Sequence, residues 1–271
     1  MILVSSEWLE KNIEKVKIID CSWHMPNTNR NAYEEFKNQH LKNSIFFDLD
    51  KNSDPNTDLP HMLVNKNSWE KIMSSMGISN KDKIVVYDNS DVISSCRLWY
   101  NLIYFGHKYE NVHVLDGGLK KWKNEKREVT NKIIEHKKTN YTADEKKYLV
   151  KNKNEISNNI LKSEFKVVDA RSRERFEGKV EEPRKGLRSG SIPKSFCLPY
   201  KELINSDNSF KKKNEIFKIF KDTLGQETTT NVIFSCGSGI TASVLALAYS
   251  LIHNKYMPII YDGSWAEYGK I

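Results

Sequence analysis

The chain has 271 residues, of which 38% are hydrophobic and 29% are charged. This composition can form a hydrophobic core, is too apolar for a disordered chain, and suits two domains of ordinary size. No stretch approaches the roughly 18 apolar residues that a membrane helix needs, and four cysteines are too few for a disulfide-dense secreted scaffold. We therefore expect a globular protein with reduced thiols.

The charge is +8, from 43 Lys and Arg against 35 Asp and Glu. Most of the excess is Lys in short clusters, which indicates a solvated, Lys-rich surface, with attraction of anionic substrates or RNA as the functional alternative. We expect no membrane partner. No basic ladder with interleaved aromatic residues supports nucleic-acid binding. Residues 1–8 lack the basic start and long apolar run of a secretory signal, so we expect a cytoplasmic location, with an organelle as the alternative.

In the first half of the chain, short β-branched runs at 17–20, 84–88 and 112–115 are too short for helices and are typical of buried parallel strands. Residues 95–105 carry apolar side chains at helical spacing. Alternating strands and helices predict an α/β domain with a largely parallel sheet.

The second half repeats the first after a polar segment at 129–140, which we interpret as a linker. Lys17 and Lys166 begin similar runs 149 positions apart, and Asp88 and Cys236 end similar runs 148 positions apart. Such a repeat in constant order indicates two copies of one domain. We expect domains at 1–128 and 141–271, with a helix over 241–253 in the second.

One loop of the second copy carries reactive chemistry. A predicted strand ends at Cys236, and Gly237-Ser238-Gly239 then leads into a helix. Glycines permit turns that direct successive N–H groups inward, and the helix adds the positive end of its dipole. A Cys in this cradle is expected to be a nucleophilic thiolate, a buried structural Cys being the alternative. Asp88 cannot be a soft nucleophile, so the first copy is expected to be catalytically silent.

These residues resemble the tandem-domain 3-mercaptopyruvate sulfurtransferases of the rhodanese superfamily over nearly the whole chain. The motifs that carry the resemblance are Phe46-Phe47-Asp48-Leu49-Asp50, His61-Met62-Leu63, Leu115-Asp116-Gly117-Gly118-Leu119, Arg175-Phe176, Glu182-Pro183-Arg184, Ser189-Gly190-Ser191-Ile192-Pro193, Cys236-Gly237-Ser238-Gly239-Ile240-Thr241 and Asp262-Gly263-Ser264-Trp265. The resemblance implies two rhodanese-like α/β domains, each a mostly parallel sheet flanked by helices.

The family also implies that a persulfide forms on Cys236 and that its sulfur passes to a thiol, such as thioredoxin or a small thiol, or to cyanide. Thiosulfate-using members have basic side chains directly after the Cys. Here Gly237 and Ser238 are uncharged, which favours 3-mercaptopyruvate as donor, with thiosulfate as the runner-up. We expect Gly237, Gly239, Ile240 and Thr241 to contribute to the substrate-binding loop, and the Thr241 hydroxyl to cap the helix.

Two arginines match the substrate-binding arginines of the family, namely Arg175 and Arg184. A guanidinium fork can grip the carboxylate and carbonyl of a 2-keto acid at two points. Both residues lie in a charged stretch, so exposed surface arginines are the alternative.

The family further implies a relay in which Asp50 orients His61 and His61 polarises Ser238, so that the leaving enolate is protonated. Each residue also has a purely structural alternative. His61 would be an interface histidine with its hydrogen bonds satisfied, Asp50 a carboxylate that caps a loop, and Ser238 a small residue of the loop.

The motifs imply no cofactor and no metal, because the cysteines lack paired zinc spacing and the chain lacks nucleotide-binding glycine motifs. Three other functions remain open. A Cys-loop phosphatase would have a loop one residue longer, often ending in Arg. A sulfur relay for tRNA thiolation and a non-catalytic interaction module are the alternatives from other classes.

Overall fold

The computed structural model describes residues 1–225, 231–253 and 255–271, which belong to two compact units. The first unit contains Met1–Pro55, Leu63–Lys146 and Ser206–Ser209, and the second contains Asn56–Met62, Lys147–Asn205 and Phe210–Ile271. The domains predicted from the sequence, 1–128 and 141–271 with a linker at 129–140, are continuous segments of the chain, and these boundaries stay a prediction.

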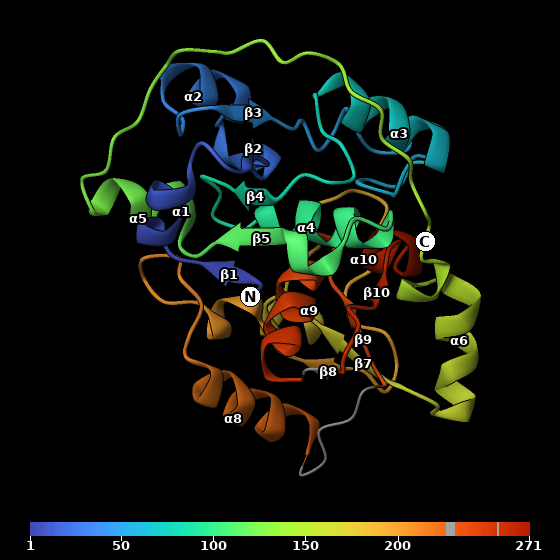
Figure 1. Ribbon diagram of the computed structural model, residues 1–271. Coiled ribbons are helices and arrows are strands. Elements are labelled where there is room, and N and C mark those ends of the chain that lie inside the picture. Colours follow the sequence, from blue (N-terminus) through green and yellow to red (C-terminus); the bar gives the residue numbers. More distant parts are fainter. Residues whose placement is uncertain (226–230, 254) are drawn as a thin grey trace. The chain divides into compact units, whose positions relative to one another are not determined.

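The first unit is built on a five-stranded sheet with the strand order β1-β5-β4-β2-β3, in which every pair is parallel (Figure 1). Its strands are β1 (Leu3–Val4), β2 (Lys17–Asp20), β3 (Ser44–Phe46), β4 (Ile84–Tyr87) and β5 (Val112–Leu115). Its α-helices are α1 (Ser6–Asn12), α2 (Ala32–Asn38), α3 (Lys66–Ser75), α4 (Ser95–Tyr104) and α5 (Gly118–Asn124).

The second unit repeats this topology with the strand order β6-β10-β9-β7-β8, again parallel throughout. Its strands are β6 (Val150–Lys151), β7 (Lys166–Asp169), β8 (Phe196–Cys197), β9 (Val232–Ser235) and β10 (Ile260–Tyr261). Its α-helices are α6 (Lys153–Lys162), α7 (Arg173–Phe176), α8 (Lys213–Leu224), α9 (Ile240–Ile252) and α10 (Ser264–Tyr268). The α/β fold class and the duplication expected from the sequence are confirmed.

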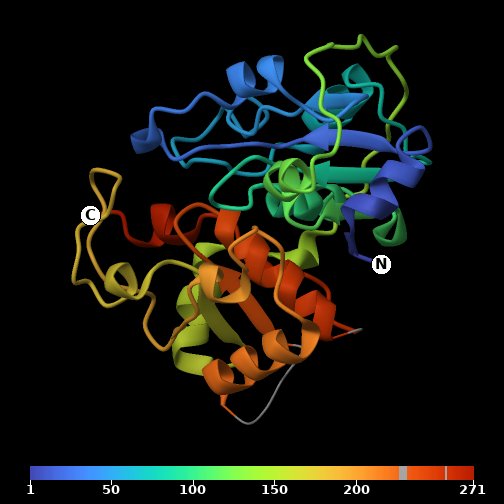
Figure 2. The same cartoon turned by 90° about the vertical axis from the view of Figure 1, so that its left-hand side faces the viewer.

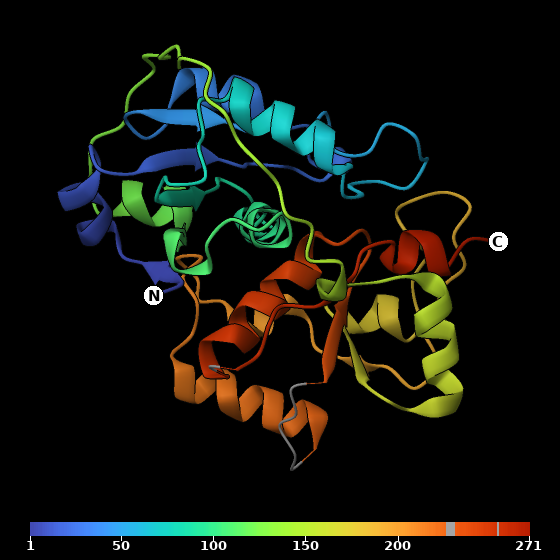
Figure 3. The ribbon, with the colours of Figure 1, turned by 45° about the vertical axis from the view of Figure 1, so that its right-hand side comes forward.

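Both faces of the second sheet are covered, which explains why its central strands are apolar without alternation. Ile233 of β9 belongs to a buried cluster with Ile156 of α6 and Trp265 of α10. The next residue, Phe234, points to the other face and contacts Tyr249 of α9 edge to face, with ring centroids 5.7 Å apart. Figure 3 accordingly shows α8 and α9 on one side of this sheet and α6 on the other.

The C-terminal segment holds the loop that follows α7. The Arg188 N–H donates to the Gly269 carbonyl over 2.9 Å, and Leu187 forms an antiparallel bridge with Lys270. Figure 2 shows this gold loop beside the red helix α10. The loop carrying Glu182-Pro183-Arg184 is therefore tied at its far end to the last residues of the chain.

Within the described residues, no helix is both long and apolar enough to span a bilayer.

Candidate active site

The candidate nucleophile lies at the carboxyl end of the central strand β9. Cys236 directly follows the strand, and only 2% of the residue is exposed. In parallel α/β sheets this end of the strands is where ligands bind. The Cys236 N–H donates to the Ser264 hydroxyl over 3.1 Å, and its carbonyl accepts from the Trp265 N–H over 2.9 Å. Helix α10 thus fixes the base of the loop.

The rest of the loop presents backbone donors. The Gly237 carbonyl accepts from the Ala266 N–H over 2.9 Å, so the carbonyl side of the loop is occupied by α10. Gly239 has φ +83°, a left-handed conformation that favours glycine, and it directly precedes α9. In the described chain, the N–H groups of residues 237–239 donate to no protein acceptor. Together with the N-terminus of α9, they can receive an anion.

The helix start differs from the sequence prediction in one respect. Helix α9 begins at Ile240, and its N-cap is Gly239, which makes no side-chain capping bond. The prediction that the Thr241 hydroxyl caps this helix is therefore wrong. The left-handed turn at Gly239 starts the helix before Thr241, so Thr241 lies in its first turn, while Ile240 is buried.

Both predicted arginines approach the loop at Gly237. A Cβ atom built on Gly237 would lie 3.4 Å from Nη2 of Arg175 and 3.5 Å from Nη1 of Arg184. Arg184 also donates from Nη2 to the Ser238 hydroxyl over 3.4 Å. The structure therefore brings two guanidinium groups to the residue that follows the candidate nucleophile, and they are not arginines on a distant surface.

An ion-pair network anchors one of these arginines. Arg175 donates from Nε and Nη2 to the two oxygens of Glu182, over 3.2 and 2.5 Å. Glu182 also accepts from Nη1 of Arg171 over 2.8 Å. Arg171 is in turn paired with Asp169, the last residue of β7, over 2.7 Å. Burial opposes the charge of Arg171, but the carboxylates of Asp169 and Glu182 outweigh it and raise the pKa of the guanidinium.

His61 and Ser238 meet in the second unit. Nδ1 of His61 lies 2.9 Å from the Ser238 hydroxyl, and both residues are buried. His61 has φ +62°. That backbone conformation is uncommon outside glycine, although His, Asn and Asp adopt it more often than most residues. The imidazole and the hydroxyl are thus in hydrogen-bond contact, as a proton relay through them would require.

The predicted third member of the relay belongs to the first unit. The carboxylate of Asp50 accepts the indole N–H of Trp23 at both oxygens, over 3.0 and 3.1 Å. Its proposed action on His61 stays a prediction.

Sequence reasoning gave no role to Glu182, Arg171 or Ser264. Glu182 and Ser264 stand inside motifs that carried the family resemblance, and Arg171 is one of several charged residues in its stretch. The role of Arg171 could have been inferred from Asp169 at the end of a predicted buried strand. A buried carboxylate needs a cation, and Arg171 is two residues away.

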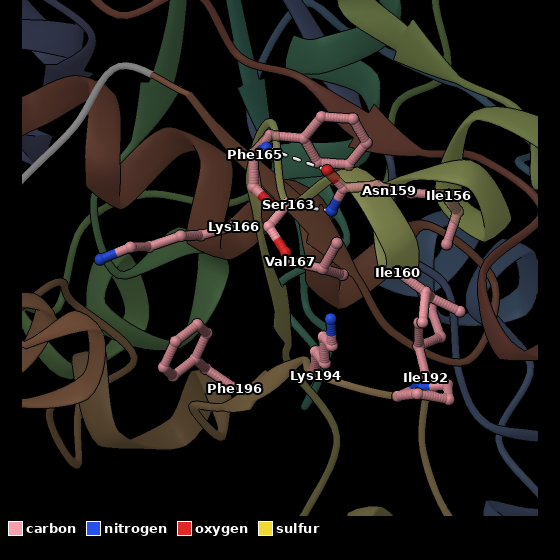
Figure 4. A pocket seen from close by; sticks show the side chains of 11 residues that line it. Ile156, Asn159, Ile160, Ser163, Phe165, Lys166, Val167, Ile192, Lys194 and Phe196 are labelled. Atoms are coloured by element: carbon pink, nitrogen blue, oxygen red, sulfur yellow. Dashed lines mark hydrogen bonds between the residues drawn. The ribbon is translucent and has the colours of Figure 1, made fainter.

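The cavity in Figure 4 is a separate feature of the second unit. It has a volume of about 230 Å³ and lies between α6, the start of β7, and β8. The side chain of Asn159 spans part of its wall through hydrogen bonds to both the N–H and the carbonyl of Phe165. None of the predicted site residues lines it. Across the described ranges of the chain, no three His, Cys, Asp or Glu side chains converge as metal ligands.

Comparisons with known proteins agree with this architecture. The family model described as "Rhodanese-like domain" matches residues 5–125 and again residues 152–270. The Arabidopsis thaliana "Thiosulfate/3-mercaptopyruvate sulfurtransferase 1, mitochondrial" is 36% identical over 98% of this chain and 75% of its own length. The mouse "3-mercaptopyruvate sulfurtransferase" is 32% identical over 98% of this chain and 91% of its own.

A solved structure is similar over the same span. The crystal structure of SseA, a 3-mercaptopyruvate sulfotransferase from Escherichia coli, matches with a TM-score of 0.85 and 29% identity, covering 98% of this chain and 99% of that one. Two copies of the domain, full-length similarity and the shared fold define the class: the chain belongs to the rhodanese family. Within that family it is a sulfurtransferase.

Proposed function

We propose that the protein transfers sulfane sulfur from 3-mercaptopyruvate, through a persulfide on Cys236, to a thiol such as thioredoxin or a small thiol, or to cyanide. The observation that carries this proposal is the approach of Arg175 and Arg184 to Gly237, beside Cys236, with uncharged residues at 237 and 238. Two guanidiniums suit the carboxylate and carbonyl of a 2-keto acid. The names of the mouse and Arabidopsis relatives support the same donor.

In the first half-reaction the Cys236 thiolate attacks the sulfur of the donor. The new S–S bond takes the electron pair of the thiolate, and the C–S bond breaks with its pair moving to carbon, which gives the enolate of pyruvate. The donor's thiol proton stays on, or is lost from, the outer persulfide sulfur. The backbone donors of residues 237–239 stabilise negative charge on sulfur during this transfer.

The enolate then needs one proton to become pyruvate. The contact between His61 and Ser238 supports a path for it, because an imidazole titrates near neutrality and the hydroxyl can pass a proton on. In the second half-reaction, an acceptor thiolate or cyanide attacks the outer sulfur. The S–S bond breaks, and its electron pair returns to Cys236 as thiolate. No external oxidant or reductant is required.

Intact-mass measurement tests the proposal directly. After incubation with 3-mercaptopyruvate and removal of excess donor, the wild-type protein should gain one sulfur atom, and added cyanide should remove it as thiocyanate. Cys236→Ser should gain none. Cys197→Ser, which removes a half-buried thiol of the same unit, is the matched control and should still gain the sulfur. A wild-type protein that gains no sulfur from this donor contradicts the proposal.

Thiosulfate is the second candidate donor, since the name of the Arabidopsis relative includes both compounds. A comparison of kcat/KM for the two donors decides between them. Delivery of the sulfur to a tRNA-thiolation partner is a further candidate for the acceptor step. The cytoplasmic location also stays a prediction, and the same relative is named as mitochondrial.

A further inference from the structure

Glu182 is a deeply buried carboxylate that contacts Arg175, one of the two proposed substrate arginines. Its side chain is 1% exposed, whereas the side chain of Arg175 is 21% exposed. Its carboxylate accepts three hydrogen bonds from two guanidiniums, one from Arg171 and two from Arg175. A buried carboxylate with this many charged donors is held in one orientation.

The network is anchored on the sheet. Arg171, which pairs with Glu182, also donates to Asp169 at the end of β7 and to the Gly190 carbonyl. Its guanidinium lies 4.5 Å from the centroid of the Trp265 ring, which adds a cation–π contact. Arg171 is therefore fixed by contacts with strand β7, with the loop of Gly190 and with helix α10. Because Arg171 donates to Glu182, the position of the Glu182 carboxylate is fixed as well.

Glu182 determines which edge of Arg175 faces the loop. The carboxylate takes the Nε and Nη2 edge, and within the described residues Nη1 donates to no protein group. Nη1 and the second N–H of Nη2 are then available to an incoming carboxylate. A guanidinium without this partner would be free to rotate about its long side chain, at an entropic cost to binding.

Glu182 also sets the charge beside the nucleophile. Glu182 bonds directly to Arg175, which approaches Gly237 beside Cys236. The charge of Glu182 therefore lowers the positive potential of the guanidiniums at the loop. A less positive potential disfavours a dianionic donor more than a donor with a single carboxylate, because the dianion needs more compensation in a largely buried site.

We propose that Glu182 is a positioning and specificity-determining residue, which orients Arg175 and limits the positive charge at Cys236, so that a monoanionic donor is preferred over a dianionic one. This inference rests on the proposed function for the identity of the donors. It is independent of that function in its electrostatic part, because the charge near Cys236 can be measured without any sulfur donor.

The electrostatic test uses the alkylation of Cys236 by iodoacetate, an anion, and by iodoacetamide, its neutral analogue. The ratio of the two rates reports the local potential at the thiol. Glu182→Gln keeps the shape of the side chain and removes its charge, so the ratio should rise by about three- to tenfold at low salt and less at high salt. Glu202→Gln, which removes an exposed carboxylate paired with Arg173 in the same unit, should leave the ratio unchanged.

The specificity test compares kcat/KM for thiosulfate and for 3-mercaptopyruvate. Glu182→Gln should raise the thiosulfate to mercaptopyruvate ratio by about three- to tenfold, even if both absolute values fall. Glu182→Asp keeps the charge but shortens the reach to Arg175. It should lower kcat/KM for both donors and leave the alkylation ratio near that of the wild type. Glu182→Gln therefore changes the charge together with one acceptor atom, whereas Glu182→Asp changes the position and keeps the charge.

An unchanged alkylation ratio and an unchanged donor ratio in a folded Glu182→Gln protein would overturn the proposal. If that variant does not fold, Arg175→Gln makes the opposite change of charge, and the alkylation ratio must then fall; an increase or no change in that ratio overturns the proposal equally. If wild-type Cys236 accepts sulfur from neither donor, the proposed function fails, while the alkylation ratio still tests the electrostatic role of Glu182.

Discussion

The two units use the same strand–loop–helix scaffold with opposite chemical results. In the second unit, Cys236 follows β9 and leaves the N–H groups of residues 237–239 without a protein acceptor. In the first unit, Asp88 follows β4, and its carboxylate accepts the N–H groups of Ser90 and Ser95, each over 2.9 Å. The chain's own carboxylate thus occupies the cradle in one copy, whereas the other copy keeps its cradle for an external anion.

The scaffold around the two loops is closely equivalent. The Asp88 carbonyl accepts the N–H of Leu119 in α5 over 2.9 Å, and the Cys236 carbonyl accepts the N–H of Trp265 in α10 over the same distance. The comparison shows that the fold supplies the donors, and that the residue at the end of the strand decides whether they are used internally or stay available to an external anion.

The two units also differ in the partner of a buried aspartate at the end of a second strand. At the end of β7, Asp169 is paired with Arg171, the first member of the network that reaches Arg175. At the end of β2, Asp20 accepts instead from the backbone N–H and hydroxyl of Ser22. A neutral partner does not compensate for burial, which raises the pKa of Asp20 to about 7.

The largest expected effect separates the two loops. Cys236→Ala should lower sulfur transfer by a factor of a thousand or more, because it removes the thiolate that is proposed to bind the sulfur covalently. Asp88→Asn keeps the size of the side chain but loses one of its two acceptor oxygens, so it should lower stability while changing kcat/KM by about twofold at most. Steady-state assays of both purified variants test this difference between the loops. An equal loss of activity in Asp88→Asn would contradict the assignment of the first loop as catalytically silent.

The next effect concerns the two arginines beside the loop of the second unit. Arg184→Ala should mainly raise KM for 3-mercaptopyruvate, and kcat/KM should fall by about ten- to a hundredfold, the cost of a lost charged hydrogen bond. The matched control is Arg173→Ala, which removes an exposed arginine of the same unit that pairs with Glu202. Similar losses in both variants would show that general surface charge, and not the grip of Arg184, attracts the donor.

A smaller effect is expected at the proton relay. His61→Asn suits the left-handed backbone at φ +62° but removes the imidazole, so it should lower kcat by about tenfold or more with little change in KM. The pH dependence of kcat should lose the limb that belongs to the imidazole. A rise in KM with kcat unchanged would indicate that His61 only shapes the loop of Ser238.

The smallest effect on turnover, and a distinct effect on stability, belongs to Asp20. Its pKa of about 7 in the folded protein exceeds the value of about 3.9 in an unfolded chain, so the folded state favours the protonated acid. The resulting stabilisation is complete below about pH 4 and is lost as the pH rises through about 7, a change on the order of 2–4 kcal/mol in the free energy of unfolding. Asp20→Asn should flatten this dependence in urea unfolding at pH 5 and pH 8.

The exposed Asp91→Asn serves as the control for that measurement. An equally steep loss of stability in Asp20→Asn would assign the pH dependence to other groups. The nearest candidate is Asp88, whose pKa is also raised by burial.

Much of the architecture could be predicted from the amino-acid sequence. Short β-branched runs, the helices between them and the near-constant spacing of matching landmarks were sufficient for two parallel α/β units, because buried strands and amphipathic helices have distinct periods. The start of α9 was misplaced by one residue, since a left-handed turn at Gly239 is a backbone property that the side-chain pattern does not reveal.

The sequence by itself determined which loop can be chemically active, because a thiol and a carboxylate at equivalent strand ends differ in nucleophilicity wherever they lie. Only the tertiary structure decided which charged residues serve that loop. Arg175, Arg184 and Glu182 stand among many charged neighbours in the chain, and their importance comes from burial, distance and direction, which depend on how strands, loops and the C-terminal helix pack together.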